Sequence, residues 1–326
     1  MTEAREARAV VTVAMGADEA AAVLTGDLRT RLAEIADFTE NWTDLYRADI
    51  VMTGWGSPAL TRTVLDRAPR LRAVVHAAGS VKRVVTDAVW ERGLVVSSAA
   101  DANAGPVVDY ACGAIALAAK RALGTAAAYE RGWPAFGERQ GADGLTVGVV
   151  GASRIGRRVI ARLGASEAGY QVLLYDPYVS AAEAARLGVE LVDVTTLCRA
   201  STIITLHAPE LPETYRLLDA ERLALIRDGG TVINTARGSL IDTEALTREC
   251  VTGRLDAFLD VTDPEPLPQG HPLPALPNVL VTPHIAGAQG SEVRRLGVFA
   301  VGEVERLLKG KPLLGQVARE ELDRLA

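Results

Sequence analysis

The fold is decided by the stretch LTVGVVGASRIG, residues 145–156. Its apolar, β-branched first half is typical of a strand that leads directly into Gly151, and a helical pattern follows over residues 154–163. This order of strand, tight turn and helix is the context that a dinucleotide-binding fingerprint requires. Gly151 allows the turn, Gly156 allows the helix to pack closely on the strand, and the amides at the start of the helix can receive a pyrophosphate. Ser153 stands at the middle glycine position of the fingerprint, and we expect binding to survive because serine is small and its hydroxyl can donate to a phosphate.

An acidic residue, Asp176, ends the next predicted strand, residues 170–175. It lies about 20 residues after Gly156, where an acid accepts the hydroxyls of the adenosine ribose. Its charge would repel a 2′-phosphate, and no Arg or Lys follows until Arg186. The sequence therefore favours NAD over NADP as the cofactor. The alternative interpretation is a generic glycine turn with Asp176 as a helix cap.

The composition predicts a globular protein of two domains. The 326 residues exceed one ordinary domain of about 150 residues. Hydrophobic residues make up 48% of the chain and charged residues 23%, a composition that allows a full-sized core. A net charge of −6, from 35 Lys and Arg against 41 Asp and Glu, disfavours nucleic acid as a partner. No apolar run approaches the ~18 residues that span a bilayer, and residues 1–8 lack the apolar region of a signal peptide. We expect a soluble cytoplasmic protein with no membrane partner, and the three separated cysteines predict neither a metal site nor a disulfide framework.

Short β-branched runs alternate with helical patterns in two series, separated by a long helical stretch over residues 107–130. Apolar strands separated by helices predict parallel sheets covered on both faces. A TIM barrel is disfavoured because it would require evenly spaced units without a break in mid-chain. The predicted strands are residues 9–15, 49–52, 71–76 and 94–98 in the first series and residues 145–150, 170–175, 189–192, 201–206, 231–235, 255–259 and 279–282 in the second.

Four ionisable residues follow successive strands of the second series. His207, Arg237, Asp260 and His284 each come directly after a predicted strand end. Ligands of a doubly wound sheet bind beyond the carboxyl ends of its strands, so these side chains and the glycine turn are expected to form one site. Residues 264–283, which run from the connection after strand 255–259 through the last predicted strand, hold seven of the 15 prolines. We interpret the connection as a stiff functional loop.

Several ordered motifs make the chain similar to the NAD-dependent, D-isomer-specific 2-hydroxyacid dehydrogenase family. Matching segments in the second half are NTARG (234–238), LDV (259–261) with EP (265–266), TPHIAG (282–287), TLHAP (205–209) and LID (240–242). The first half matches more loosely, through AAGSV (77–81) and VVDYA (107–111), where Asp109 replaces the usual Glu. The resemblance implies an α/β fold of two doubly wound parallel-sheet domains. A flavodoxin-like substrate domain would comprise residues 1–117 plus 299–326, and a Rossmann NAD-binding domain residues 118–298.

The resemblance also implies a reaction, hydride transfer between NADH and a 2-keto acid to give a D-2-hydroxy acid, and a homodimer. Arg237, Glu265 and His284 would be catalytic. The chemistry agrees, because Arg can grip a carboxylate and polarise a keto oxygen. A His paired with a carboxylate can supply the proton. Asp260 would hold the nicotinamide carboxamide. The full expected set is Gly151, Ser153, Arg154, Ile155, Gly156, Asp176, His207, Thr235, Ala236 and Asp260 for NAD, Ala78, Gly79 and Ser80 for the substrate, and no metal ligand.

Alternatives stay open at this point. Each proposed catalytic residue also has a non-functional interpretation. Arg237 could form a surface salt bridge, Glu265 could be a solvated side chain, and His284 could be a structural histidine. Within the same fold, the rival activity is oxidation of another small anion, such as formate or phosphite. Outside enzymes, the rival is a dinucleotide-sensing, corepressor-like binding protein. Trp55 and Trp133 are candidates for lining the pocket around the substrate side chain.

Overall fold

The structure, a computed structural model, describes residues 8–129 and 132–324. It divides into two compact units. Unit 1 contains the chain up to Ala104 and again from Ala288, and unit 2 contains Gly105–Gly287. The chain thus passes between the units inside α5 (Ala100–Ala119) and again just before α12 (Arg294–Leu308). We expected these passages after residues 117 and 298; α12 belongs wholly to unit 1 because its apolar face packs on α1 (Ala17–Val23) and α2 (Gly26–Ile35).

Unit 1 is built on a five-stranded parallel sheet in the order β2-β1-β3-β4-β5. This is the flavodoxin-like strand order, as expected. Its strands are β1 (Val10–Ala14), β2 (Asp37–Thr39), β3 (Ile50–Thr53), β4 (Ala73–His76) and β5 (Val95–Ser98). The remaining helical elements are η1 (Trp42–Arg47), α3 (Arg62–Asp66), α4 (Asp87–Glu91), η7 (Gly290–Glu292) and η8 (Arg319–Arg324).

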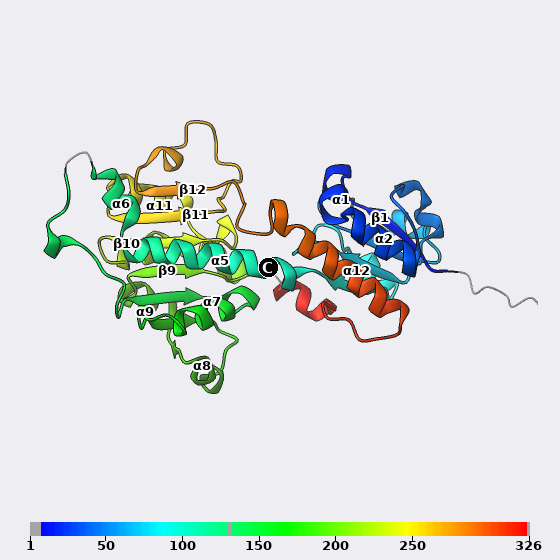
Figure 1. The fold of residues 1–326 in the computed structure, drawn as a ribbon. Coiled ribbons are helices and arrows are strands. Elements are labelled where there is room, and N and C mark those ends of the chain that lie inside the picture. Colours follow the sequence, from blue (N-terminus) through cyan, green and yellow to red (C-terminus); the bar gives the residue numbers. More distant parts are fainter. Residues whose placement is uncertain (1–7, 130–131, 325–326) are drawn as a thin grey trace, which may run out of the picture. The chain divides into compact units, whose positions relative to one another are not determined.

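The central strands of unit 1 are buried on both faces, which explains their continuous apolar sequences. Every residue of β1, β3 and β4 is buried. One face packs on α1, α2 and α12, which lie together in Figure 1, and the other packs on α3, α4 and the loops beside them. β2 was not predicted, because its three residues are too short to show a pattern.

Unit 2 is built on a seven-stranded sheet, all parallel, in the order β12-β11-β10-β9-β6-β7-β8. The strand order reverses between β6 and β9, which is the arrangement of a Rossmann fold. The strands are β6 (Thr146–Val150), β7 (Gln171–Tyr175), β8 (Glu190–Leu191), β9 (Ile203–Leu206), β10 (Gly230–Asn234), β11 (Leu255–Leu259) and β12 (Val279–Val281).

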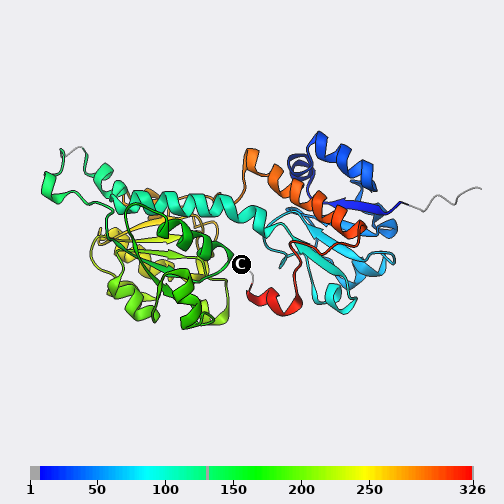
Figure 2. The ribbon, with the colours of Figure 1, turned by 60° about the horizontal axis from the view of Figure 1, so that its bottom comes forward.

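Helices cover both faces of the unit 2 sheet. The segment of α5 in this unit lies along one face with α7 (Arg154–Gly164). The other face is covered by α9 (Val194–Ala200), α10 (Ala220–Leu225) and α11 (Thr243–Val251) (Figures 1 and 2). The predicted single helix over residues 107–130 is wrong: Arg121, with φ +49°, separates α5 from α6 (Ala122–Ala127), and residue 130 lies outside the described residues. The other elements are η3 (Phe136–Glu138), α8 (Ala181–Leu187), η4 (Pro212–Thr214), η5 (Gly238–Leu240) and η6 (Leu273–Ala275).

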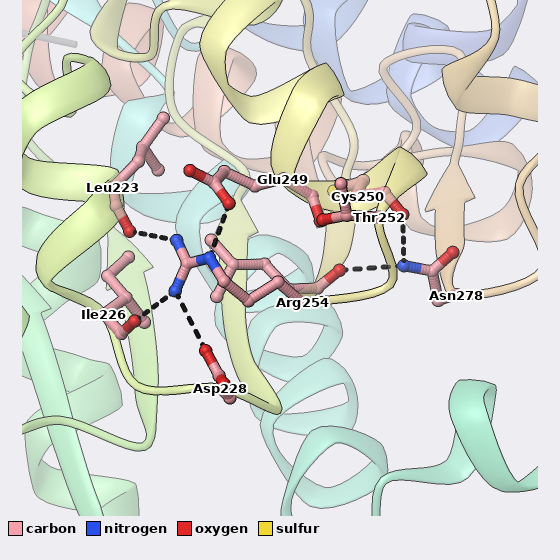
Figure 3. Close-up of polar contacts among 9 residues, drawn as sticks. Leu223, Ile226, Asp228, Glu249, Cys250, Thr252, Arg254 and Asn278 are labelled. Atoms are coloured by element: carbon pink, nitrogen blue, oxygen red, sulfur yellow. Dashed lines mark hydrogen bonds and ion pairs between the residues drawn. The ribbon is translucent and has the colours of Figure 1, made fainter.

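The amino ends of β11 and β12 are fixed by two side chains that saturate nearby carbonyls. The Arg254 guanidinium donates to the Leu223 carbonyl at 2.6 Å and to the Ile226 carbonyl, and it pairs with Glu249 at 2.5 Å (Figure 3). Asn278, just before β12, donates through Nδ2 to the carbonyls of residues 250 and 255, at 3.0 and 2.8 Å. These contacts tie the end of α10 and the end of α11 to the sheet.

Candidate active site

The glycine turn after β6 lies against the loop after β9, at the point where the strand order reverses. Gly151 has φ +91°, and a Cβ there would lie 2.7 Å from the Ala208 backbone. A Cβ on Gly156 would lie 2.0 Å from the Gly151 carbonyl oxygen. Both positions therefore exclude a side chain for the reasons that the fingerprint requires. The Ser153 hydroxyl caps α7 by accepting from the Gly156 amide at 3.3 Å.

Asp176 holds the glycine turn from the neighbouring strand. One carboxylate oxygen accepts from the Ala152 amide at 2.7 Å and the other from the Tyr178 amide at 2.8 Å. The cap of α8 is Ser180, so Asp176 does not serve as that helix cap. A carboxylate oxygen can accept more than one donor, so this half-buried group can still accept from a ribose hydroxyl.

His207 and Thr235, both predicted to line the cofactor site, follow β9 and β10 and are buried. The His207 ring contacts the Thr205 hydroxyl through Nε2 at 3.0 Å, and burial lowers the pKa of His207 to about 3. The imidazole is therefore neutral and cannot serve as an acid near neutral pH. Within the described part of the chain, His207 Nδ1 and the Thr235 hydroxyl have no hydrogen-bond partner. Buried polar atoms left in this way are available to a ligand.

Arg237 lies on a loop that is clamped from two sides. Asn234 donates through Nδ2 to the Arg237 carbonyl at 2.8 Å and accepts through Oδ1 from the Ala236 amide at 3.0 Å. A Cβ on Gly238 would lie 2.0 Å from the Thr262 carbonyl, so the loop after β10 touches the loop after β11. The Arg237 guanidinium is half-buried and donates to the Ala236 carbonyl at 2.6 Å. Sequence reasoning missed the role of Asn234, although a polar residue ending an apolar strand was a usable signal.

Asp260 organises the loop after β12. Its side chain is buried, with one oxygen accepting from the Thr282 hydroxyl at 2.7 Å and from the Ile285 amide at 2.8 Å. The other oxygen accepts from the Ala286 amide at 2.9 Å. The His284 amide donates to the Asp260 carbonyl at 2.9 Å. Asp260 thus fixes the turn that presents His284, and its second oxygen retains capacity for one more donor.

Tyr110, on α5, extends this network. Its hydroxyl lies 2.7 Å from the Thr282 hydroxyl. Because the Thr282 proton is directed to Asp260, Tyr110 is the donor in this contact. Burial raises the pKa of Tyr110, and the charge of Asp260 acts in the same direction. Sequence reasoning missed this residue because its partner is 172 positions away.

His284 and Glu265 form the pair that the motifs predicted to be catalytic. His284 Nδ1 lies 2.7 Å from Glu265 Oε1, which leaves Nε2 as the ring nitrogen that can meet a substrate. The side chains are 53% and 43% exposed, so the pair is accessible rather than part of the core. His284 has φ +55°, a backbone conformation that costs a non-glycine residue about 1 kcal/mol. The surrounding hydrogen bonds hold it there.

The predicted substrate residues lie in unit 1, on the loop after β4. Ala78 is buried, and Gly79 and Ser80 are half-buried. Trp55, on the neighbouring loop after β3, is 38% exposed, whereas Trp133 of unit 2 is 75% exposed. No group of His, Cys, Asp and Glu side chains within residues 8–129 and 132–324 could hold a metal ion. In the same residues, no helix has the length and apolar character needed to cross a bilayer.

The fold and the glycine turn define unit 2 as a dinucleotide-binding domain. Residues 113–286 match the family model described as D-isomer specific 2-hydroxyacid dehydrogenase, NAD binding domain. The chain belongs to the D-isomer specific 2-hydroxyacid dehydrogenase family, and unit 2 is its NAD-binding part.

Relatives of known name agree with this assignment. The chain is 33% identical over 268 residues to a D-3-phosphoglycerate dehydrogenase of Methanocaldococcus jannaschii, covering 81% of this chain and 50% of that protein. It is 31% identical over 267 residues to a glyoxylate reductase of Thermofilum pendens, covering 79% of this chain and 78% of that protein. The chain thus spans about half the length of the phosphoglycerate dehydrogenases it matches.

Solved structures show the same two-domain fold. The TT0316 protein of Thermus thermophilus superposes with a TM-score of 0.74 at 31% identity, over 95% of this chain and all of that one. The D-mandelate dehydrogenase of Rhodotorula graminis superposes with a TM-score of 0.80 at 23% identity, over 96% of this chain and 98% of that one.

Proposed function

We propose that this protein is an NAD-dependent oxidoreductase that transfers a hydride between NADH and a 2-keto acid, giving a D-2-hydroxy acid. The observation that carries the proposal is the His284–Glu265 pair at 2.7 Å. It lies on the loops after β11 and β12, next to the Arg237 loop after β10, in an NAD-binding unit. An accessible proton donor, its carboxylate partner and a guanidinium are the groups that reduction of a keto acid requires.

Each of the three residues has a distinct role in this proposal. NADH, when bound to unit 2, would supply the hydride that the keto carbon accepts. Arg237 grips the carboxylate and polarises the keto oxygen with its planar fork. His284 gives a proton from Nε2 to the oxygen as the carbonyl bond opens, so that the alkoxide becomes a hydroxyl. Glu265 holds the ring orientation and stabilises the imidazolium before that transfer.

Unit 1 would supply the substrate-binding loop. The amides of Gly79 and Ser80 are proposed to bind the substrate carboxylate, and Ala78 shapes the loop beneath them. On this view unit 1 binds the substrate carboxylate and unit 2 binds NAD.

The test of activity is a panel of 2-keto acids with NADH and NADPH, followed by cofactor absorbance. Oxidation of NADH by at least one 2-keto acid, with a D-2-hydroxy acid as product, is the expected result. Tight NADH binding without turnover of any member would contradict an enzyme of this class and favour a dinucleotide-sensing protein.

Asp176 is proposed to make the enzyme prefer NADH, because its charge would repel a 2′-phosphate. Asp176→Ala should narrow the ratio of NADH to NADPH kcat/KM by about tenfold or more, one like-charge contact being worth about 1.4 kcal/mol. Asp193→Ala is the matched control, since Asp193 also accepts backbone and side-chain hydrogen bonds but caps α9 instead. A wild-type enzyme equally active with both cofactors would contradict the role of Asp176.

We also propose a cytoplasmic homodimer. The three cysteines are free thiols, which suits a reducing compartment. Support for self-association comes from Trp133 and Phe136, which are 75% and 86% exposed, with the Arg139 guanidinium 5.8 and 5.7 Å from their ring centroids. Aromatic and Arg side chains are enriched in interfaces. Light scattering of the wild type and of a Trp133→Ala, Phe136→Ala variant tests this: the variant should be the smaller species.

A further inference from the structure

The loop after β4 is held on its inner side by a buried serine. Ser98, the last residue of β5, is 4% exposed. Its one hydroxyl proton is shared by the Gly79 carbonyl, at 2.6 Å from Oγ, and the Ala78 carbonyl, at 3.2 Å. It also accepts from the Ala100 amide at 3.1 Å. Two successive carbonyls of the loop therefore point toward the interior of unit 1.

A buried histidine holds the next residue of the same loop. His76, at the end of β4, is 3% exposed and contacts the Thr53 hydroxyl through Nδ1 at 3.0 Å. It also forms a hydrogen bond with the backbone of Ser80, and burial lowers the pKa of His76 to about 4. The ring is neutral above about pH 5, so this anchor does not change across an ordinary assay range.

Because these two carbonyls point inward, the amides in the same peptide units point outward. In a planar trans peptide, the carbonyl of one residue and the N–H of the next point in opposite directions. With the Ala78 and Gly79 carbonyls directed to Ser98, the amides of Gly79 and Ser80 point away from it. Among the described residues neither amide donates to a protein acceptor. Successive free amides on a loop form a site for an anion.

We propose that Ser98 is a positioning residue for recognition of the substrate carboxylate: it fixes the peptides of Ala78 and Gly79 so that the Gly79 and Ser80 amides face the ligand. The inference rests on the proposed function, which assigns the carboxylate to this loop. A Cβ at Gly79 would lie 3.2 Å from Asn103 Nδ2, so a side chain at this position would crowd Asn103.

The neighbouring serine is a matched control. Ser97 is equally buried in β5, but its hydroxyl donates to Glu303 of α12 at 2.5 Å, on the opposite face of the strand. Glu303 in turn accepts from the amides of Leu314 and Gly315. Ser97→Ala and Ser98→Ala each remove one buried hydroxyl with one short hydrogen bond. Only Ser98→Ala releases the substrate loop.

The test compares Ser98→Ala, Ser98→Thr and Ser97→Ala by steady-state kinetics and by calorimetric titration of the NADH-bound enzyme with oxamate, a 2-keto acid analogue that carries a carboxylate. Ser98→Ala should raise both the KM for the best 2-keto acid and the oxamate Kd by about tenfold, the usual effect of one lost hydrogen bond. The kcat at saturation should stay within about twofold, because the amides bind substrate and transition state alike. Ser98→Thr keeps the hydroxyl and should restore most of the affinity.

The outcomes separate this inference from the proposed function. Ser97→Ala should lower Tm without changing KM, and NADH affinity should be unchanged in all three variants. Equal KM and oxamate Kd in Ser98→Ala and wild type would overturn the role of Ser98 while the proposed function stands. A wild type that binds oxamate but reduces no 2-keto acid would contradict the proposed function alone, and the Kd ratio would still decide the role of Ser98. A wild type that neither binds oxamate nor reduces a keto acid would overturn both.

Discussion

Arg254 and Asn278, at the starts of β11 and β12, differ from the residues that follow the strands of the unit 2 sheet. At the amino edge, Arg254 satisfies the carbonyls that end α10 and pairs with Glu249, and Asn278 satisfies two more carbonyls (Figure 3). These side chains have their polar atoms paired with the protein itself. These paired contacts at the starts of β11 and β12 serve stability.

At the carboxyl edge, several polar groups are exposed or lack a partner among the described residues. His284 has a left-handed backbone, and its ring and Glu265 are about half exposed. His207 and Thr235 each bury a polar atom that lacks a partner in the described residues. The strained backbone of His284 and the unpaired polar groups of His207 and Thr235 persist because the rest of the sheet stabilises them. The comparison predicts that substitutions at the carboxyl edge change activity and those at the amino edge change stability.

Arg237→Lys should give the largest change in activity of the substitutions proposed here. It therefore tests whether the carboxyl edge serves catalysis. Lysine keeps the charge but lacks the planar fork, so transition-state stabilisation should fall by about 2–4 kcal/mol. Tm and NADH affinity should barely change, because the loop is held by Asn234 and by the contact of Gly238 with Thr262. Wild-type kcat/KM in this variant for every accepted keto acid would show that Arg237 is not the substrate clamp.

Arg254→Met is the counterpart at the amino edge. Methionine keeps much of the apolar stem but leaves the Leu223 and Ile226 carbonyls and Glu249 unpaired, which should cost about 2 kcal/mol of unfolding free energy. Denaturant titration measures this loss, and kcat/KM measured well below the melting temperature should equal that of the wild type. A variant of normal stability with impaired catalysis would reverse the assignment of the two edges.

Much of this contrast could be predicted from the sequence, for reasons that differ between residues. The glycine turn is local, so strand, turn and helix are adjacent in the chain. Arg237, Asp260 and His284 could be grouped because parallel topology places the ends of successive strands on one edge. Tyr110 and Ser98 could not, since each acts on a loop through a contact that only the folded chain creates. The break at Arg121 was equally hidden, because the pattern on both sides of it is helical.

The loss of unfolding free energy at low pH should also depend on His207, at the carboxyl edge. The pKa of His207 is about 3 in the folded state, against about 6.5 for an unperturbed histidine, so the unfolded state binds the extra proton as pH falls. Its contribution is complete above about pH 6.5 and shrinks on acidification, by about 1.4 kcal/mol at pH 5.5. His207→Gln should therefore have a shallower loss of unfolding free energy between pH 7 and 5 than the wild type. His76, in unit 1, keeps its own share in both proteins, and an identical slope would exclude the linkage through His207.

Glu265→Gln should give the smallest change, because it removes a charge while keeping a similar shape. The Glu265 carboxylate contacts His284 Nδ1 at 2.7 Å and holds the orientation of the ring that gives the proton. An exposed ion pair contributes less than about 1 kcal/mol, so kcat/KM for keto-acid reduction should fall by less than about tenfold. Tm and NADH affinity should stay near those of the wild type. His284→Ala is the control, since it removes the proton donor and should lose most of the activity while its Tm stays near that of the wild type. A loss in Glu265→Gln as large as the loss in His284→Ala would show that Glu265 does more than orient the ring.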